Sequence, residues 1–175
     1  MGRFDIEDQT FSVLPFRVVV DTREQAPFHF TNIDNLIVPL TTNKALESGD
    51  YSIEGLEALV SIERKSVGDF CGSITSDRDR FQREMRRLAD LDYAAVVIEG
   101  SWPEFQSDAR RSRVTTATIQ GTMIAWSMDY GVHFFPCMSR RHAEVMTLRI
   151  LQRYWKKHQA ELEAMKAYPA TVNID

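Results

Sequence analysis

Asp50, Glu63 and Lys65 are the residues whose types and spacing could do chemistry. Residues 59–65 have the composition of a β-strand, in which side chains alternate between two faces, so Glu63 and Lys65 point the same way. Residues 50–53 form a second short predicted strand, with turn-forming residues between the two. If the strands pair as a hairpin, Asp50 lies nearly opposite Glu63. Two carboxylates and an ammonium then converge at one point of a sheet.

Such a convergence suits a hard divalent cation, which prefers oxygen ligands, while the lysine orients a water or stabilises an anion. The pattern therefore predicts the chemistry of a metal-dependent phosphodiesterase, with Asp50 and Glu63 as metal ligands. Asp21 is the predicted third carboxylate, because it ends the apolar run 16–20, and open α/β sheets place their sites at such strand ends. An ordinary surface cluster of ion pairs is the alternative interpretation.

The order of these residues resembles the signature of the XPF/Mus-type structure-specific endonucleases. Three segments carry the resemblance: GD (49–50) with ERK (63–65) and Asp69, VVVDTRE (18–24), and RFQRE (80–84) with Leu88. The resemblance implies an α/β, restriction-endonuclease-like core with a central mixed β-sheet flanked by helices. It also implies dependence on Mg2+ or Mn2+, DNA as the substrate, and dimerisation.

The resemblance extends the predicted catalytic set to Glu24, Arg64 and Asp69. The Arg64 carbonyl is a further metal ligand in this interpretation, and Lys65 positions the attacking water or stabilises charge in the transition state. Glu24 assists a second metal or a water. Asp69 either belongs to the site, or caps the helix predicted over 67–74 or pairs with Arg64.

Arginines in three places are candidates for contact with DNA phosphates. The first is Arg23, in the segment 18–24. The second is one face of a helix predicted over 78–91, with Arg80, Arg83 and Arg87. The third is a polar loop predicted over 106–113, with Arg110, Arg111 and Arg113. Arg23 fits a bracing role beside the carboxylates better. For the others the alternative is a solvated surface, since the net charge of −4 is unlike the basic footprint of most DNA-binding proteins.

The remaining pattern predicts the elements that must position these residues. Residues 36–40, 94–98 and 132–135 are predicted strands, and helices are predicted from 102, over 115–130, and from 139 to about 167. We expect a lead-in at 1–14 (an extra strand or a tail), a nuclease domain at 15–168 and a tail at 169–175. No helix-hairpin-helix or helicase pattern is found.

The last helix is apolar on two sides, which indicates either deep burial or a shared interface. The residues predicted to form a homodimer or heterodimer interface are Leu148, Leu151, Tyr154 and Trp155, together with Gly121 of a small-residue stripe.

Composition sets the protein class. The 175 residues are 43% hydrophobic and 26% charged, as in an ordinary single globular domain, with no apolar run of membrane-spanning length. The isolated Cys71 and Cys137, and the absence of a secretory signal pattern, predict an intracellular protein.

Two functions of different classes follow. The first is a metal-dependent DNA endonuclease acting on branched, flap or fork DNA in repair, recombination, or phage or mobile-element DNA processing, with a nuclease lacking structure preference as a weaker variant. The second is a non-catalytic nuclease-fold subunit that scaffolds a partner. The retained Asp21, Asp50, Glu63 and Lys65 favour the first.

Overall fold

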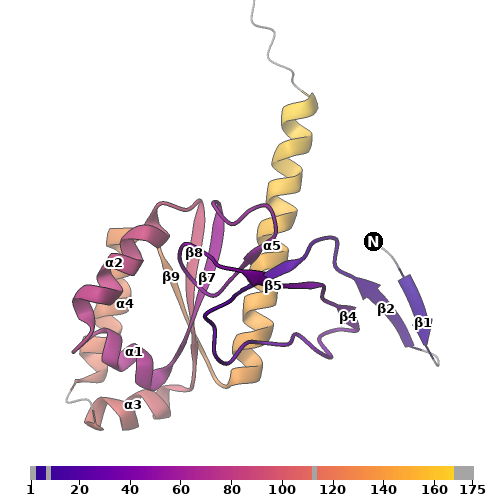
Figure 1. Cartoon of the computed structure of the whole chain (residues 1–175). Coiled ribbons are helices and arrows are strands. Elements are labelled where there is room, and N and C mark those ends of the chain that lie inside the picture. The colour runs from indigo at the N-terminus through magenta and orange to yellow at the C-terminus, as the bar shows by residue number, and fades with distance from the viewer. Residues whose placement is uncertain (1–2, 7–8, 112–113, 168–175) are drawn as a thin grey trace, which may run out of the picture.

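A mixed six-stranded sheet forms the centre of the computed structural model, which describes residues 3–6, 9–111 and 114–167 (Figure 1). The strand order is β5 (Leu40–Lys44), β3 (Val18–Asp21), β6 (Tyr51–Ile53), β7 (Val60–Ser66), β8 (Tyr93–Glu99), β9 (His133–Cys137). Strands β7, β8 and β9 are parallel, whereas β6 runs antiparallel to both of its neighbours. The predicted α/β fold with a central mixed sheet is confirmed.

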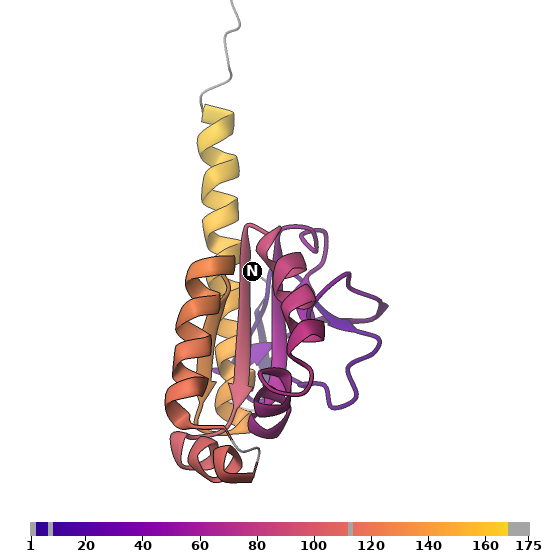
Figure 2. The same ribbon diagram turned by 90° about the vertical axis from the view of Figure 1, so that its left-hand side faces the viewer.

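Helices cover both faces of this sheet, because alternate strand residues are apolar on both sides. The long helix α5 (Arg140–Ala167) packs on one face, and α1 (Val67–Ser73), α2 (Arg78–Ala89), α3 (Trp102–Arg111) and α4 (Thr116–Tyr130) cover the other (Figures 1 and 2). Along β8, Ala95 and Val97 join the core beneath α5, while Val96 and Ile98 join the core beneath α1–α4.

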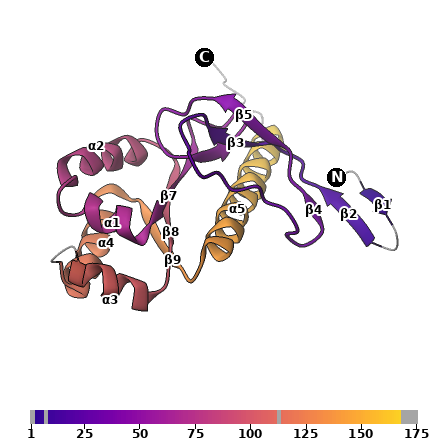
Figure 3. The same ribbon diagram turned by 60° about the horizontal axis from the view of Figure 1, so that its bottom comes forward.

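The N-terminal segment forms a second, small sheet beside the main one. Strands β1 (Arg3–Ile6) and β2 (Gln9–Val13) pair as a hairpin, and β2 pairs with β4 (Leu36–Ile37). Figure 3 shows this hairpin projecting away from the main sheet. The lead-in therefore supplies extra strands, while the tail predicted at 169–175 lies outside the described residues.

Three predicted elements differ from the structure. Residues 36–40 are not one strand, because the chain leaves β4 before Pro39 and joins a different sheet at β5. Residues 106–111 are not a loop: α3 continues to Arg111, since Phe105 and Ala109, one turn apart, are both buried. Strand β9 continues past Pro136, which is tolerated because β9 lies at the edge of the sheet.

Among the described residues, no helix has the length and apolar character required to cross a bilayer.

Candidate active site

Asp21, Asp50 and Glu63 lie in one row across three neighbouring strands. The register pairs Val20 with Tyr51 and Tyr51 with Ile62, so the next residues along β3, β6 and β7 are the three acids. The backbone confirms this alignment: the Asp21 N–H donates to the Asp50 carbonyl at 2.8 Å, and the Asp50 N–H donates to the Ile62 carbonyl at 2.9 Å. The predicted opposition of Asp50 and Glu63 is therefore present.

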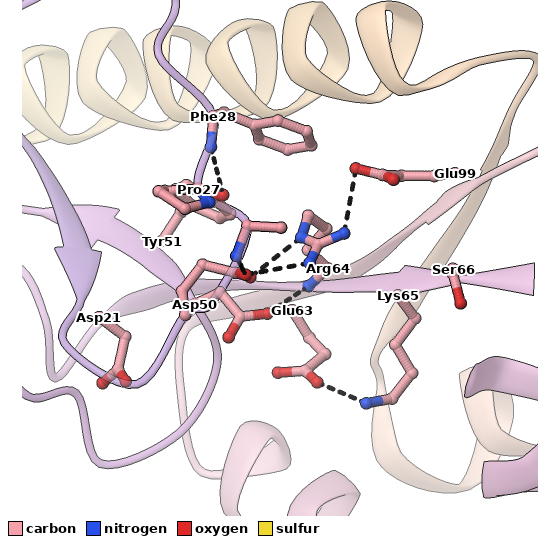
Figure 4. A network of polar contacts seen from close by, with 12 residues as sticks. Asp21, Pro27, Phe28, Asp50, Tyr51, Glu63, Arg64, Lys65, Ser66 and Glu99 are labelled. Carbon is pink, nitrogen blue, oxygen red and sulfur yellow. Dashed lines mark hydrogen bonds and ion pairs between the residues drawn. The ribbon is translucent and has the colours of Figure 1, made fainter.

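Asp50 and Glu63 are neighbours in this row (Figure 4), with Glu63 buried and Asp50 half-buried, so both carboxylates are poorly solvated. Burial raises the pKa of Asp50 to about 7, although the Arg64 N–H donates to its Oδ2 at 2.7 Å. Burial, and then the neighbouring Asp50 charge, raise the pKa of Glu63 well above its usual range. A divalent cation between two such carboxylates would relieve both effects, so the donor set fits a hard metal ion.

Asp21 shares the row, but its oxygens are already occupied. Its Oδ1 accepts hydrogen bonds from the Arg23 backbone and Nε, both at 2.8 Å, and its Oδ2 accepts one from the Leu46 N–H at 2.6 Å. Burial raises the pKa of Asp21, but these hydrogen bonds outweigh it and hold the pKa below its usual value. In the described part of the chain, no three His, Cys, Asp or Glu side chains are grouped to hold a metal. Asp21 therefore braces the loop after β3, and its role as a third metal ligand stays a prediction.

Arg64 points to the opposite face of β7 from Lys65 (Figure 4) and forms a network with Glu24 there. Arg64 Nε and Nη2 donate to the two oxygens of Glu24, each at 2.9 Å. Arg64 Nη1 also lies 3.2 Å from Glu99 of β8, and Arg140 of α5 donates to the same Glu99 oxygen at 2.8 Å. Because both Glu24 oxygens accept hydrogen bonds from Arg64, Glu24 braces this network, and its contact with a second metal or a water stays a prediction. Arg140 had no distinguishing signal in the sequence.

Lys65 connects the carboxylate pair to a hollow beside α1 and α2. Its Nζ donates to Glu63 Oε1 at 2.6 Å and lies 4.5 Å from the centre of the Phe81 ring. Burial lowers the pKa of Lys65, but the charge and hydrogen bond of Glu63 and the charges of Glu84 and Asp50 together outweigh it and raise the pKa above its usual value. The hollow, about 260 Å³, is lined mainly by polar residues: Lys65, Gly68, Asp69, Gly72, Ser73, Asp77, Arg80, Phe81 and Glu84.

Two acidic residues of this hollow have separate roles. Asp69 lies in the first turn of α1 and is the partner of the N-cap residue Ser66: the Asp69 N–H donates to Ser66 Oγ at 3.0 Å, and Ser66 Oγ donates to the Asp69 carboxylate at 2.7 Å. Of the two structural roles that the sequence left open, Asp69 therefore takes part in the cap of α1 as the partner of Ser66, and it makes no hydrogen bond or ion pair with Arg64 among the described residues. Glu84 also lines this hollow but is not among the residues predicted for the site. It follows Phe81 by three residues on the same face of α2, and this spacing could have indicated its position near Lys65.

The candidate DNA-contacting arginines occupy different environments. Arg80 is exposed and lines the hollow next to Lys65, and Arg83 and Arg87 are exposed on α2. The Arg23 side chain is 66% exposed although it binds Asp21. Arg110 and Arg111 lie in the last turn of α3, with Arg111 3.6 Å from Asp108, and Arg113 lies outside the described residues.

The predicted interface residues of α5 lie mostly inside the chain's own core. Leu148 and Leu151 are fully buried, and Tyr154 is 6% exposed. Trp155 is half-buried and packs 5.3 Å from the Phe16 ring. The breadth of the apolar surface of α5 is therefore explained by the sheet and the Phe16 segment, and the prediction that Leu148 and Leu151 face a partner is wrong. Gly121 does lie on an exposed face of α4.

A mixed sheet covered by helices, with two carboxylates and a lysine at adjacent strands, defines an α/β domain of the nuclease class. The ERCC4 domain family model matches residues 20–149, about three quarters of the chain. The chain therefore belongs to the ERCC4 domain family, the family of XPF-type nucleases, and the resemblance stated from the sequence is confirmed.

Two solved structures with the same fold are similar to this chain. XPF from Aeropyrum pernix matches with a TM-score of 0.57 and 25% identity over 79% of this chain and 60% of that chain. XPF from Aeropyrum pernix in complex with DNA matches with a TM-score of 0.59 and 23% identity over 81% of this chain and 66% of that chain. The match thus spans less than two thirds of either structure's length. No curated protein matches the chain.

The first prediction concerns Gly49, which places Asp50 in the row. Its φ is +79°, and an added Cβ would lie 2.1 Å from Ser61 Oγ, inside the sheet. We expect Gly49→Ala to lower the free energy of unfolding by about 2–4 kcal/mol, measured by urea denaturation. Gly55→Ala is the matched control, because φ there is +83° with nothing within 4 Å of the added Cβ; it should cost only about 1–2 kcal/mol. Equal losses would contradict this account.

The second prediction concerns pH. Because the pKa of Asp50 is raised to about 7, the folded chain binds more protons than the unfolded chain between about pH 4 and pH 7. The contribution of Asp50 to the free energy of unfolding therefore falls as the pH rises through this window. Without metal, we expect Asp50→Asn to be more stable than the wild type at pH 8, by about 1–3 kcal/mol, with the difference disappearing near pH 4.

Asp21→Asn provides the opposite control, because its pKa is lowered and its ionised form stabilises the fold. This contribution is present above about pH 4 and is lost as the pH falls through the folded pKa, so the variant should be less stable than the wild type at pH 8. Urea denaturation in EDTA measures both. An Asp50→Asn variant that is less stable than the wild type at pH 8 would refute the assignment of a strained carboxylate.

Proposed function

We propose that this chain is a divalent-metal-dependent endodeoxyribonuclease that hydrolyses phosphodiester bonds in branched, flap or fork DNA. The single observation that supports the proposal most is the pair formed by Asp50 and Glu63, two poorly solvated carboxylates with raised pKa values beside a lysine. Membership of the ERCC4 domain family supports DNA as the substrate. A role in repair, recombination, or phage or mobile-element DNA processing is part of the same proposal.

In this proposal Asp50 and Glu63 hold Mg2+ or Mn2+, and the bound ion would supply a polarised phosphate and a water of lowered pKa. Lys65 has a buried stem and an ammonium fixed against Phe81, so it can face a phosphate oxygen without losing much side-chain freedom. Arg80, exposed at the rim of the same hollow, can contact a neighbouring phosphate and set the register of the DNA.

The protein residues around this pair hold it in a fixed geometry. The Arg64 N–H orients Asp50, and the Arg64 side chain ties β7 to the loop after β3 through Glu24 and to α5 through Glu99. Such bracing keeps the two carboxylates close despite their repulsion, which lowers the cost of organising them for the reaction.

A non-catalytic subunit that scaffolds a DNA-processing partner is the second candidate. It is favoured by one specific observation: two of the family-type acids, Asp21 and Glu24, direct their oxygens to arginines. Cleavage by the purified chain separates this candidate from the first.

The third prediction is that cleavage of fluorescent flap, fork and linear duplex DNA requires Mg2+ or Mn2+ and both carboxylates. We expect Asp50→Asn and Glu63→Gln to lower the cleavage rate on the order of 100-fold or more, because each removes a charged ligand from the reaction centre. Asp129→Asn, an exposed acid of α4, is the control and should cut like the wild type.

Cutting by Asp50→Asn at the wild-type rate, or cutting in EDTA, would contradict the catalytic assignment. Equal cutting of flap, fork and linear DNA would contradict structure selectivity alone. A wild-type chain without activity on any substrate would favour the scaffold.

We further propose that the chain forms a homodimer or heterodimer, and that the exposed face of α4 takes part in it. Ile124 is 61% exposed and Met128 81%, and Trp102 of α3 is 40% exposed beside them. Gly121 lies one turn before Ile124, with open space around it. Exposed apolar residues grouped in this way are typical of interaction surfaces.

The fourth prediction tests this surface by light scattering at micromolar concentration. We expect the mass of the wild type, alone or with its partner, to exceed the 20.1 kDa of one chain. The double variant Ile124→Glu, Met128→Glu should have the mass of one chain, because burying two charges in the interface would oppose association. Met165→Glu, at an exposed position of α5 (71%), is the control. An unchanged mass in the double variant would exclude this face.

A further inference from the structure

A second pocket lies on the face of the sheet opposite to Lys65, beneath α5. It measures about 280 Å³ and has a mainly apolar surface. Its lining consists of Tyr93, Arg149, Ile150, Arg153, Tyr154 and Lys157. Tyr93 begins β8 and pairs with Val60, whereas Glu63 pairs with Val96, so the pocket is about 10 Å from the acidic row along the strands, on the other face.

Two aromatic residues, Tyr93 and Tyr154, line this pocket, and each has its ring nearly parallel to that of a histidine outside the lining. Tyr93 stacks on His133 with 4.8 Å between ring centres and an angle of 17°, and it lies 6.4 Å from Tyr154. Tyr154 in turn lies parallel to His158, at 6.3 Å and 9°. The Tyr154 hydroxyl donates to Asp92 at 2.9 Å, which fixes the orientation of its ring. Rings held in this way offer a stacking surface that is already ordered before a ligand binds.

Cations stand around the rim. Arg149 contacts Asp34, and Lys157 lies 3.4 Å from Asp92 and 3.6 Å from Glu161. These acidic side chains are about half exposed, so solvent screens the pairs and an anion can compete for the cations. Arg153 is exposed and has no hydrogen bond or ion pair with any residue that the structure describes. The rim therefore has an uncompensated positive charge directly above an apolar, aromatic floor.

We propose that this pocket binds an unpaired nucleotide of single-stranded nucleic acid, distinct from the segment at the acidic site. The base lies against Tyr93 and Ile150, and Arg153, with Arg149 and Lys157, contacts the adjoining phosphates. An apolar floor alone would accept any apolar group, but an apolar ring directly joined to an anionic backbone matches the floor and the rim together. A duplex places its bases inside the stack, so it leaves the floor empty.

The fifth prediction is measured by fluorescence anisotropy with a labelled oligothymidine of about 12 nucleotides, in EDTA so that no cleavage occurs. We expect Tyr93→Leu to weaken binding about 5- to 100-fold, the range for loss of one stacked base. Arg153→Gln, a surface change that leaves the core intact, should weaken it several-fold and reduce the salt dependence of the dissociation constant. Arg86→Gln, an exposed arginine of α2, is the matched control and should bind like the wild type.

Further probes decide which part of the ligand is recognised. An abasic oligonucleotide and a duplex of equal length should bind more weakly than oligothymidine, and an acidic peptide of equal charge should compete poorly. Wild-type affinity in both Tyr93→Leu and Arg153→Gln, equal binding of the abasic strand, equal competition by the peptide, or no binding by the wild type would each overturn the proposal.

The acidic site is tested separately, because Asp50→Asn should bind oligothymidine at least as tightly as the wild type while it loses cleavage. Cleavage by Asp50→Asn at the wild-type rate, with binding weakened in Tyr93→Leu, would contradict the acidic site alone. Loss of cleavage in Asp50→Asn, with wild-type binding in both Tyr93→Leu and Arg153→Gln, would contradict the pocket alone.

Discussion

Two carboxylates side by side in a poorly solvated part of a sheet repel each other and lose most of their hydration, and the rest of this structure is arranged around that constraint. Asp50 and Glu63 are brought together by strand register, a backbone feature that neither side chain can relax. The neighbouring Lys65 offsets part of the charge on one side, and a single backbone N–H does so on the other. A proton or a metal ion completes the balance, which is why the pair is suited to chemistry and poorly suited to stability alone.

Alternation along β7 divides two tasks between the two faces of the sheet. Glu63 and Lys65 point to one side of β7, toward α2 and the polar hollow, whereas Arg64 points to the other (Figure 4). There Arg64 joins the network of Glu24, Glu99 and Arg140. The charged face holds reactive groups, and the opposite face ties together the loop after β3, two strands and a helix. A rigid support directly behind a strained pair limits how far its carboxylates can separate.

The acidic net charge is consistent with this arrangement once the arginines are located. Arg23, Arg64 and Arg140 each bind a carboxylate inside the domain, so part of the basic content serves internal bracing. Arg80 at the hollow and Arg153 at the pocket beneath α5 remain exposed. Local cations of this kind set where a polyanion can lie even when the average field of the protein is negative.

The strands that carry Asp21, Asp50 and Glu63, and the opposition of Asp50 and Glu63, follow from the sequence, because alternation and turn residues act over a few neighbouring positions. The break between β4 and β5 does not, because it depends on which sheet each short segment joins. Tertiary structure alone decided which acids are free: Asp21 and Glu24 share the motif, but Arg23 and Arg64 bind their oxygens. It likewise decided that Leu148 and Leu151 face the sheet, since the width of an apolar surface does not reveal whether the chain itself or a partner covers it.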